Sequence, residues 1–250
     1  MLTRSFIHLP GVGPRRELAI WRAGVADWAG FLERGRDLLP RAVYERGRPV
    51  VEASLAALER PGGLSELAGL FPPAEHWRFH PHFRRIVALD IETGGAADDW
   101  GGVTVVGLYD GQRVEQYVAD SNMWLLNDAM KGYDVVLTFA GSTFDLPVLR
   151  QVFPNLFVPP IHIDLRWLLA RLGLKGGLKR IERLLGISRP PEVAGLGGYD
   201  ALLLWQRHLA GEPGALDALL AYNAQDVVNL PPLLEWGVGR LRERLLGRLG

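Results

Sequence analysis

The spacing of apolar positions along the chain changes once, near residue 80. Before that point, short apolar segments recur at helical spacing, and after it continuous apolar runs of strand length begin. We therefore expect two parts, a small helical N-terminal region (residues 1–80) and a larger domain (residues 82–250). The 250 residues, 48% of them hydrophobic, are enough to form a full core for the larger part.

The N-terminal region is predicted to consist of short helices. A tight turn, Leu9–Pro14, precedes a helix through Arg22, and a second helix is expected over Val25–Leu32. A Gly-x-Gly turn at a helix N-terminus exposes backbone amides that can hold a phosphate. The turn resembles the hairpin of helix-hairpin-helix nucleic-acid modules, and it also fits an ordinary helix-initiating turn. Breaks at Pro61-Gly62-Gly63 and at Phe71-Pro72-Pro73 predict a segmented linker before the larger domain.

The larger domain is predicted to begin with three strands. The segments Ile86–Ile91, Val103–Tyr109 and Arg113–Val118 have the composition and length of strands, and Asp110-Gly111 is typical of a hairpin turn. The first segment is almost continuously apolar, as expected of a strand that is covered on both faces. It should therefore be central, and the other two should form an antiparallel ribbon beside it.

Helices and strands alternate after this ribbon. A helix is expected over Met123–Met130, a fourth strand over Asp134–Phe139 and a short fifth strand over Ile161–Ile163. The remaining segments are helical in pattern and include a helix from about Ala215 to Leu230. Three antiparallel strands followed by alternating helix and strand are the order of a ribonuclease H-like α/β fold, with a mixed central sheet flanked by helices.

The composition limits which metal ligands and binding surfaces the protein can have. The absence of cysteine excludes disulfides and thiolate metal sites, and it leaves oxygen and imidazole groups as the strong metal ligands. Basic and acidic residues number 28 each, so any surface for nucleic acid must come from local segregation of charge. No apolar run approaches the ~18 residues of a membrane span, and the first residues do not resemble a targeting signal. We expect a cytoplasmic protein without membrane contact.

The first predicted strand ends in two acids separated by one residue, Asp90 and Glu92. The period of two in a strand sends both carboxylates to the same face. Neighbouring carboxylates repel each other unless a cation lies between them, and a divalent metal is the usual cation. Taken alone, the pair also fits a solvated strand end before a turn.

Later segments add further acids. Asp145 follows the fourth strand through a loop of small residues and opens a helix, where it also fits an N-cap. Tyr222 and Asp226 are four positions apart in a helix, so the phenol and the carboxylate share one face. A half-buried tyrosine and a solvated acid are the alternative interpretation of that pair. Asp164, after the fifth strand, is expected to cap a helix.

The ordered set of Asp90, Glu92, Asp145, Tyr222 and Asp226 resembles the motifs of the DEDD exonuclease superfamily. In its DEDDy branch, a tyrosine precedes the last acid by four positions. The resemblance implies a metal-dependent nuclease, a 3′-to-5′ exonuclease that uses two divalent ions, Mg²⁺ or Mn²⁺. The implied substrate is DNA or RNA, with a single-stranded 3′ end.

The same resemblance implies a role for each residue. Asp90 would bridge both ions, Glu92 and Asp226 would hold the ion that activates water, and Asp145 would contribute to the other. Tyr222 would orient the attacking water, since an ordinary phenol has a pKa near 10 and is a poor acceptor of protons at neutral pH.

Two further segments, Ile161–Leu165 and Gly177–Arg189, bring the resemblance closer to the YprB-type ribonuclease H-like domain, and in all it covers about residues 82–232. One position departs from the pattern, because members often have asparagine where this chain has Ala140. That residue is not a metal ligand in the superfamily, so the departure concerns substrate positioning or efficiency. A catalytically weak or silent nucleic-acid-binding module of the same fold is the alternative function.

A basic segment supplies the local charge that the neutral composition conceals. Over residues 164–189, seven basic residues stand against two acidic ones. We expect Lys175, Lys179, Arg180 and Arg183 to contact the phosphates of a nucleic acid. An ordinary solvated helical face is the alternative.

Overall fold

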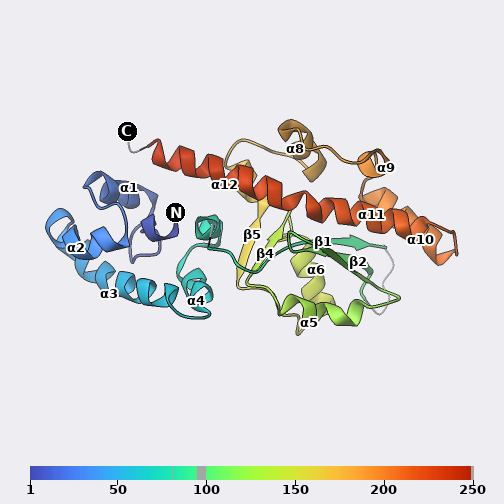
Figure 1. The fold of residues 1–250 in the computed structure, drawn as a ribbon, viewed down its shortest axis with the longest axis horizontal. Coiled ribbons are helices and arrows are strands. Elements are labelled where there is room, and N and C mark those ends of the chain that lie inside the picture. The colour runs from blue at the N-terminus through green and yellow to red at the C-terminus, as the bar shows by residue number, and fades with distance from the viewer. Residues whose placement is uncertain (81, 95–99, 249–250) are drawn as a thin grey trace. The chain divides into compact units, whose positions relative to one another are not determined.

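The computed structural model describes residues 1–80, 82–94 and 100–248 (Figure 1). Internal contacts divide the chain into two compact units. The first unit consists of Met1–Phe83 together with Val238–Gly250, and the second consists of Arg84–Gly237. The described part of the first unit is helical, whereas the second contains the sheet.

The first unit is built from short helices. They are η1 (Leu2–Arg4), α1 (Pro14–Arg22), α2 (Trp28–Leu38), α3 (Arg41–Leu58), α4 (Gly63–Leu70), η2 (Pro73–Phe79) and the last part of α12 (Leu230–Leu246). The Gly-x-Gly turn leads into α1, with Gly13 as its N-cap. Helix α2 begins three residues later than predicted because Asp27 caps it, accepting a hydrogen bond from the Gly30 amide at 2.8 Å.

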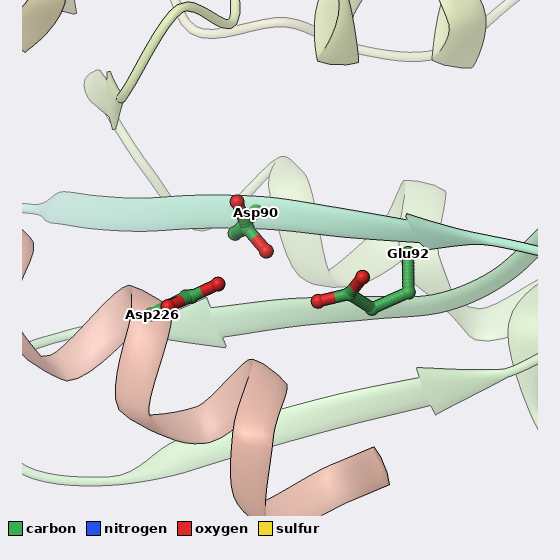
Figure 2. A group of neighbouring side chains, drawn as sticks. All are labelled: Asp90, Glu92 and Asp226. Atoms are coloured by element: carbon green, nitrogen blue, oxygen red, sulfur yellow. The ribbon is translucent and has the colours of Figure 1, made fainter. Parts of the chain in front are cut away.

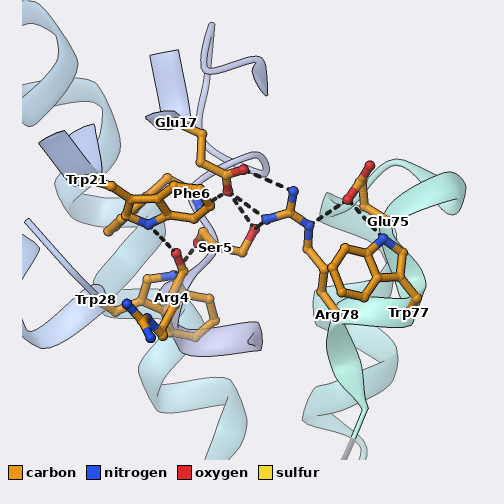
Figure 3. Close-up of polar contacts among 9 residues, drawn as sticks. All are labelled: Arg4, Ser5, Phe6, Glu17, Trp21, Trp28, Glu75, Trp77 and Arg78. Atoms are coloured by element: carbon orange, nitrogen blue, oxygen red, sulfur yellow. Dashed lines mark hydrogen bonds and ion pairs between the residues drawn. The ribbon is translucent and has the colours of Figure 1, made fainter. Parts of the chain in front are cut away.

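The linker predicted before the larger domain is wrong. Residues 73–79 form the 3₁₀ helix η2, and five of its side chains are buried: Glu75, His76, Trp77, Arg78 and Phe79. Arg78 donates to both carboxylate oxygens of Glu17, at 2.8 and 2.9 Å, and to Glu75 at 2.5 Å (Figure 3). A buried guanidinium needs such partners to offset its loss of water. The prolines therefore begin a packed element of the first unit.

The second unit is built on a five-stranded mixed sheet in the order β3-β2-β1-β4-β5. The strands are β1 (Ile86–Thr93), β2 (Val103–Tyr109), β3 (Val114–Val118), β4 (Val135–Thr138) and β5 (Ile161–Asp164). Strand β1 is antiparallel to β2 and parallel to β4, which confirms the predicted α/β fold and the central position of the first strand. The predicted hairpin joins β2 to β3, and its Asp110 side chain accepts hydrogen bonds from the Gln112 and Arg113 amides.

Helices cover both faces of this sheet (Figure 1). They are η3 (Met123–Leu125), α5 (Leu126–Met130), α6 (Asp145–Val152), α7 (Leu165–Ala170), α8 (Leu178–Leu185), α9 (Pro191–Ala194), α10 (Gly198–Leu209), α11 (Ala215–Val228) and the first part of α12. Helix α11 packs on β1 and β2, and α5 lies on the other side of the sheet. The core includes the fully buried side chains of Leu89, Val105, Val136 and Leu219.

The helix predicted from about Ala215 to Leu230 is α11, which ends two residues earlier than predicted. Helix α11 ends at Val228 and α12 begins at Leu230. Pro231 and Pro232 have no amide hydrogen to continue the hydrogen-bond ladder of α11, and proline is well accommodated in a first turn. None of the described helices is both long and apolar enough to cross a membrane.

Candidate active site

Three carboxylates meet where α11 packs on the central strand. Asp90 and Glu92 project from β1 and Asp226 projects from α11 (Figure 2). One oxygen of each lies within 4.8 Å of the other two. Asp90 is partly exposed, whereas Glu92 and Asp226 are each only 6% exposed. The strand period therefore places both β1 acids on one face, as predicted, and tertiary packing adds the third acid.

Asp145 lies beside this group without belonging to it. It is the first residue of α6, and its Oδ1 accepts a hydrogen bond from the Ile91 amide at 3.2 Å. The parallel pairing of β1 with β4 covers only Ile86–Ala88, so the Ile91 amide lies beyond that pairing. Asp145 thus contacts the peptide between Asp90 and Glu92, and it does not cap its own helix.

Burial raises the pKa of each of these carboxyl groups, and repulsion from neighbouring acids adds to the effect at Asp90, Glu92 and Asp145. Burial, followed by repulsion from Asp226 and Glu92, raises the pKa of Asp90 well above its usual range. Burial and then Asp226 raise the pKa of Glu92 to about 8, and burial raises that of Asp145 to about 6. Burial also raises the pKa of Asp226, against the opposing effect of Arg189. Lys179 and Arg189 act in the opposite direction but do not offset the burial, so the pKa values of these carboxyl groups stay raised.

Two cationic side chains reach the acids. Lys179 Nζ donates a hydrogen bond to the Tyr222 hydroxyl at 2.6 Å and lies 4.3 Å from the centre of its ring. Arg189 Nη2 lies 2.5 Å from Asp226 Oδ1. Lys179 was predicted as a phosphate contact and lies within the site. Arg189 belongs to the basic segment but was not predicted as a site residue, because sequence spacing does not reveal that it folds inward.

Asn223 is a further site residue that the sequence analysis missed. Its side chain is fully buried; Nδ2 donates to Asp90 Oδ2 at 3.2 Å, and Oδ1 accepts from Gln116 Nε2 at 3.0 Å. A Cβ atom at Gly107, opposite Asp90 on β2, would overlap the Asn223 side chain. A glycine inside a strand often marks such a close approach, so Gly107 was the available signal.

A pocket of about 250 Å³ opens beside the acids. Its lining residues are Asp90, Phe139, Gly177, Leu178, Lys179, Arg180, Tyr222 and Asp226. Lys175 and Arg183, the other two predicted nucleic-acid contacts, are exposed and do not line it. The pocket thus combines acids that can hold a cation with basic groups that can contact a phosphate.

The loop after β4 has an unusual backbone at Ala140. Its φ is 68°, and no other non-glycine residue in the described part of the chain has a positive φ. The amides of Ala140 and Ser142 donate to Asp164 at 2.9 and 3.0 Å, and Asp164 also caps α7 as predicted, through the Arg166 amide. Left-handed backbone favours glycine and asparagine. An asparagine at this position would therefore suit the backbone better than alanine does.

The mixed sheet, with paired acids on its central strand, defines a ribonuclease H-like α/β protein. Residues 87–238, more than half of the chain, match the family model RNase_H_2, described as the RNase_H superfamily. The chain belongs to the RNase H superfamily. No curated protein sequence matches it significantly.

Solved structures similar to this chain include polymerase and exonuclease domains. The family B DNA polymerase of Pyrobaculum calidifontis is 20% identical with a TM-score of 0.49, and the match covers 61% of this chain and 24% of the polymerase. The Nibbler EXO domain of Aedes aegypti is 14% identical with a TM-score of 0.48, covering 75% and 92%. Escherichia coli RNase D is 19% identical with a TM-score of 0.43, covering 75% and 48%.

Proposed function

We propose that the protein is a metal-dependent nuclease that hydrolyses phosphodiester bonds of DNA or RNA. The observation that carries this proposal is the group of three carboxylates, Asp90, Glu92 and Asp226, within 4.8 Å of one another. Their donor set consists of oxygen alone, which suits Mg²⁺ or Mn²⁺. Their raised pKa values support the same conclusion, since a divalent cation would replace the protons that the metal-free cluster retains.

The proposed metal ligands are Asp90, Glu92 and Asp226, with Asp145 contributing to a second ion. When bound, the ions supply a water of lowered pKa and neutralise the charge that grows on the phosphate. Asn223 holds Asp90 through one oxygen and leaves the other for a cation. Asp145 is held beside the same strand by the Ile91 amide.

Tyr222 orients groups at the reacting phosphate and does not act as a base. Burial, followed by repulsion from Asp226 and Glu92, raises the pKa of its hydroxyl above the ordinary value. The hydroxyl therefore stays protonated, hydrogen-bonds to the Asp226 carboxylate, and would orient a water or phosphate beside that acid. Lys179 holds the phenol oxygen and brings positive charge to the pocket where the phosphate would bind.

The finer assignment that we propose is a DEDDy-type 3′-to-5′ exonuclease of the YprB type, acting on a single-stranded 3′ end with two ions. The order of the acid motifs supports it, as does the burial of both Tyr222 and Asp226 on the site face of α11. Arg180 lines the pocket, and Lys175 and Arg183 are exposed nearby in the chain, so these three contact the backbone of the strand.

Labelled single strands test this function. The full chain is incubated with 3′- or 5′-labelled DNA and RNA in Mn²⁺, Mg²⁺ or EDTA, and we expect metal-dependent shortening from the 3′ end. Asp90→Asn should slow cleavage about 10³-fold, as expected for loss of several kcal/mol of metal assistance. Asp134→Asn, which removes an acid that pairs with Arg85, is the control and should cleave normally. Absence of metal-dependent cleavage of every strand contradicts the proposal.

A catalytically silent nucleic-acid-binding module is the second candidate. Ala140 favours it, because this position, one residue after the pocket-lining Phe139, offers no polar side chain to a substrate. The expected result in that case is strand binding without turnover under every metal condition. Gain of cleavage in Ala140→Asn, with binding unchanged, would show that this position limits the reaction.

A further inference from the structure

A buried ion network connects Asp226 to the end of helix α8. Arg189, whose side chain is 5% exposed, donates from Nε and Nη2 to the two oxygens of Glu182, both at 2.6 Å. Its Nη2 also lies 2.5 Å from Asp226 Oδ1. Glu182, 1% exposed, accepts a further hydrogen bond from Asn229 of the α11–α12 junction, at 2.9 Å. One guanidinium thus joins a carboxylate on α8 to a carboxylate on α11.

This network does not face the substrate pocket. Neither Arg189 nor Glu182 lines that pocket, and both side chains are almost completely covered. Arg189 is therefore not available to the phosphates of a strand, in contrast to Lys179 and Arg180. A buried Arg–Glu pair also contributes little stability compared with apolar residues of the same size. The role that remains for it lies in its third contact, with Asp226.

The contact with Arg189 restrains Asp226 through one of its two oxygens. Oδ1 faces the guanidinium, and the Tyr222 hydroxyl also hydrogen-bonds to this carboxylate, whose remaining lone pairs are left for a cation. Groups that contact a metal-binding side chain on the side away from the metal orient that side chain and strengthen metal binding. Asn223 provides the corresponding hydrogen bond to Asp90 Oδ2.

Glu182 neutralises the positive charge of Arg189. A lone guanidinium beside Asp226 would neutralise that acid and repel a dication. Glu182 offsets the guanidinium with both of its oxygens, so the pair carries no net charge and the acid cluster keeps its own. We propose that Arg189 and Glu182 form a charge-neutral positioning pair that orients Asp226 for a divalent cation, an inference that rests on the metal site of the proposed function.

Mn²⁺ binding to the full chain, measured by calorimetry, tests the pair. The variant carries Arg189→Met together with Glu182→Met, so that neither charge is left buried alone. We expect its dissociation constant for Mn²⁺ to rise about 10–100-fold, the effect of losing groups that support metal ligands. Raised Mn²⁺ concentration should then restore cleavage towards the wild-type rate, which would not happen if the substitutions only damaged the fold.

Single substitutions separate orientation from charge. Glu182→Gln leaves the guanidinium without its offset, and Mn²⁺ binding should weaken because the excess positive charge repels the ion. Arg189→Lys keeps the charge but loses the planar fork that bonds both oxygens of Glu182, and it should bind Mn²⁺ with an affinity between those of the wild type and the double variant. The control is Arg85→Met with Asp134→Met, which removes an exposed two-bond pair of the same unit and should leave Mn²⁺ affinity unchanged.

The possible outcomes distinguish the two proposals. Equal Mn²⁺ affinity in the wild type and in a double variant that circular dichroism shows to be folded overturns the positioning pair and leaves the metal site intact. Absence of Mn²⁺ binding in the wild type overturns the metal site and the positioning pair together. If the double variant does not fold, Arg189→Lys provides the answer, and wild-type Mn²⁺ affinity in that variant overturns the positioning pair.

Discussion

Both units bury carboxylates, but the partners of those carboxylates differ. In the first unit, Glu17 accepts hydrogen bonds from the Ser5 hydroxyl, the Phe6 amide and Arg78, and Arg78 also pairs with Glu75 (Figure 3). Both acids thus accept hydrogen bonds from donors in the same unit. These carboxylates therefore need no bound cation to stabilise their charge.

In the second unit, Asp90, Glu92 and Asp226 face one another (Figure 2). Burial raises their pKa values, that of Glu92 to about 8, and repulsion adds to the effect at Asp90 and Glu92. Arg189 pairs with Asp226, and Glu182 already neutralises the charge of that guanidinium. Burial of acids alone therefore does not indicate a binding site. A lack of hydrogen-bond donors around buried acids does indicate one, because such acids are stable only when protonated or when bound to a cation.

The largest effect is expected from removing the internal partner in the first unit. Arg78→Met leaves Glu17 and Glu75 buried without their cation, and it should lower the free energy of unfolding by about 3–5 kcal/mol. Urea denaturation of the full chain measures this change. Arg85→Met, at an exposed ion pair, is the control and should change stability by less than about 1 kcal/mol. An equally small change for Arg78→Met would show that the network is not needed.

The second unit should instead depend on pH and on added metal. The ordinary pKa of glutamate is 4.5 and that of folded Glu92 is about 8, so between these pH values the folded state binds more protons than the unfolded state. Stability of the metal-free protein should therefore be greatest below pH 4.5 as far as this group is concerned, and it should fall as pH rises to about 8. Saturating Mn²⁺, at 100 times its dissociation constant, should add about 2.7 kcal/mol.

Thermal melts in EDTA and in Mn²⁺ across this pH range measure both effects. The difference between the two melting temperatures should grow with pH, because the ion competes with protons for the same carboxylates. A gap that stays constant with pH would show that Mn²⁺ binds away from the acids.

The same kind of substitution should change stability in opposite directions in the two units. At pH 8, Asp90→Asn replaces a carboxyl group whose charged form is disfavoured by burial and by its acidic neighbours, and it should raise the metal-free free energy of unfolding. Glu17→Gln removes a carboxylate that accepts charged hydrogen bonds and should lower it. Urea denaturation in EDTA measures both variants. Destabilisation by both substitutions would remove the distinction between a structural and a binding cluster.

The smallest effect is expected in the loop after β4. Ala140→Gly should stabilise the protein by about 0.5–1 kcal/mol, since glycine adopts a φ of 68° without the strain that a Cβ introduces. This gain should not depend on pH, which separates backbone strain from charge repulsion in the second unit. Ala53→Gly, on the exposed side of α3, is the control and should destabilise by about 1 kcal/mol. Destabilisation by Ala140→Gly would show that the backbone at Ala140 is not strained.

Local patterns predicted the sheet and the acids on its central strand. The continuous apolar run before Asp90 predicted a central strand, and the Asp-x-Glu spacing placed both side chains on one face. Asp164 was predicted as a cap and is one. The predicted linker was wrong, because proline and glycine mark breaks between elements but do not show whether the residues between them are packed.

The partners of the buried charges could not be predicted in the same way. Arg189 and Lys179 look alike in sequence, as members of one basic segment, and they differ in the structure. One is enclosed between Glu182 and Asp226, and the other reaches Tyr222 in the pocket.

The sequence by itself determined the order of the strands along the chain and the face of the strand or helix on which each acid lies, because strand and helix periods are local properties of the chain. The residue types determined the chemistry available to those acids. Only the tertiary structure decided which acids lie together, which basic side chain is already paired and where the pocket opens. Those properties depend on distances between elements such as β1, α8 and α11, and packing sets these distances, whatever the separation of the elements along the chain.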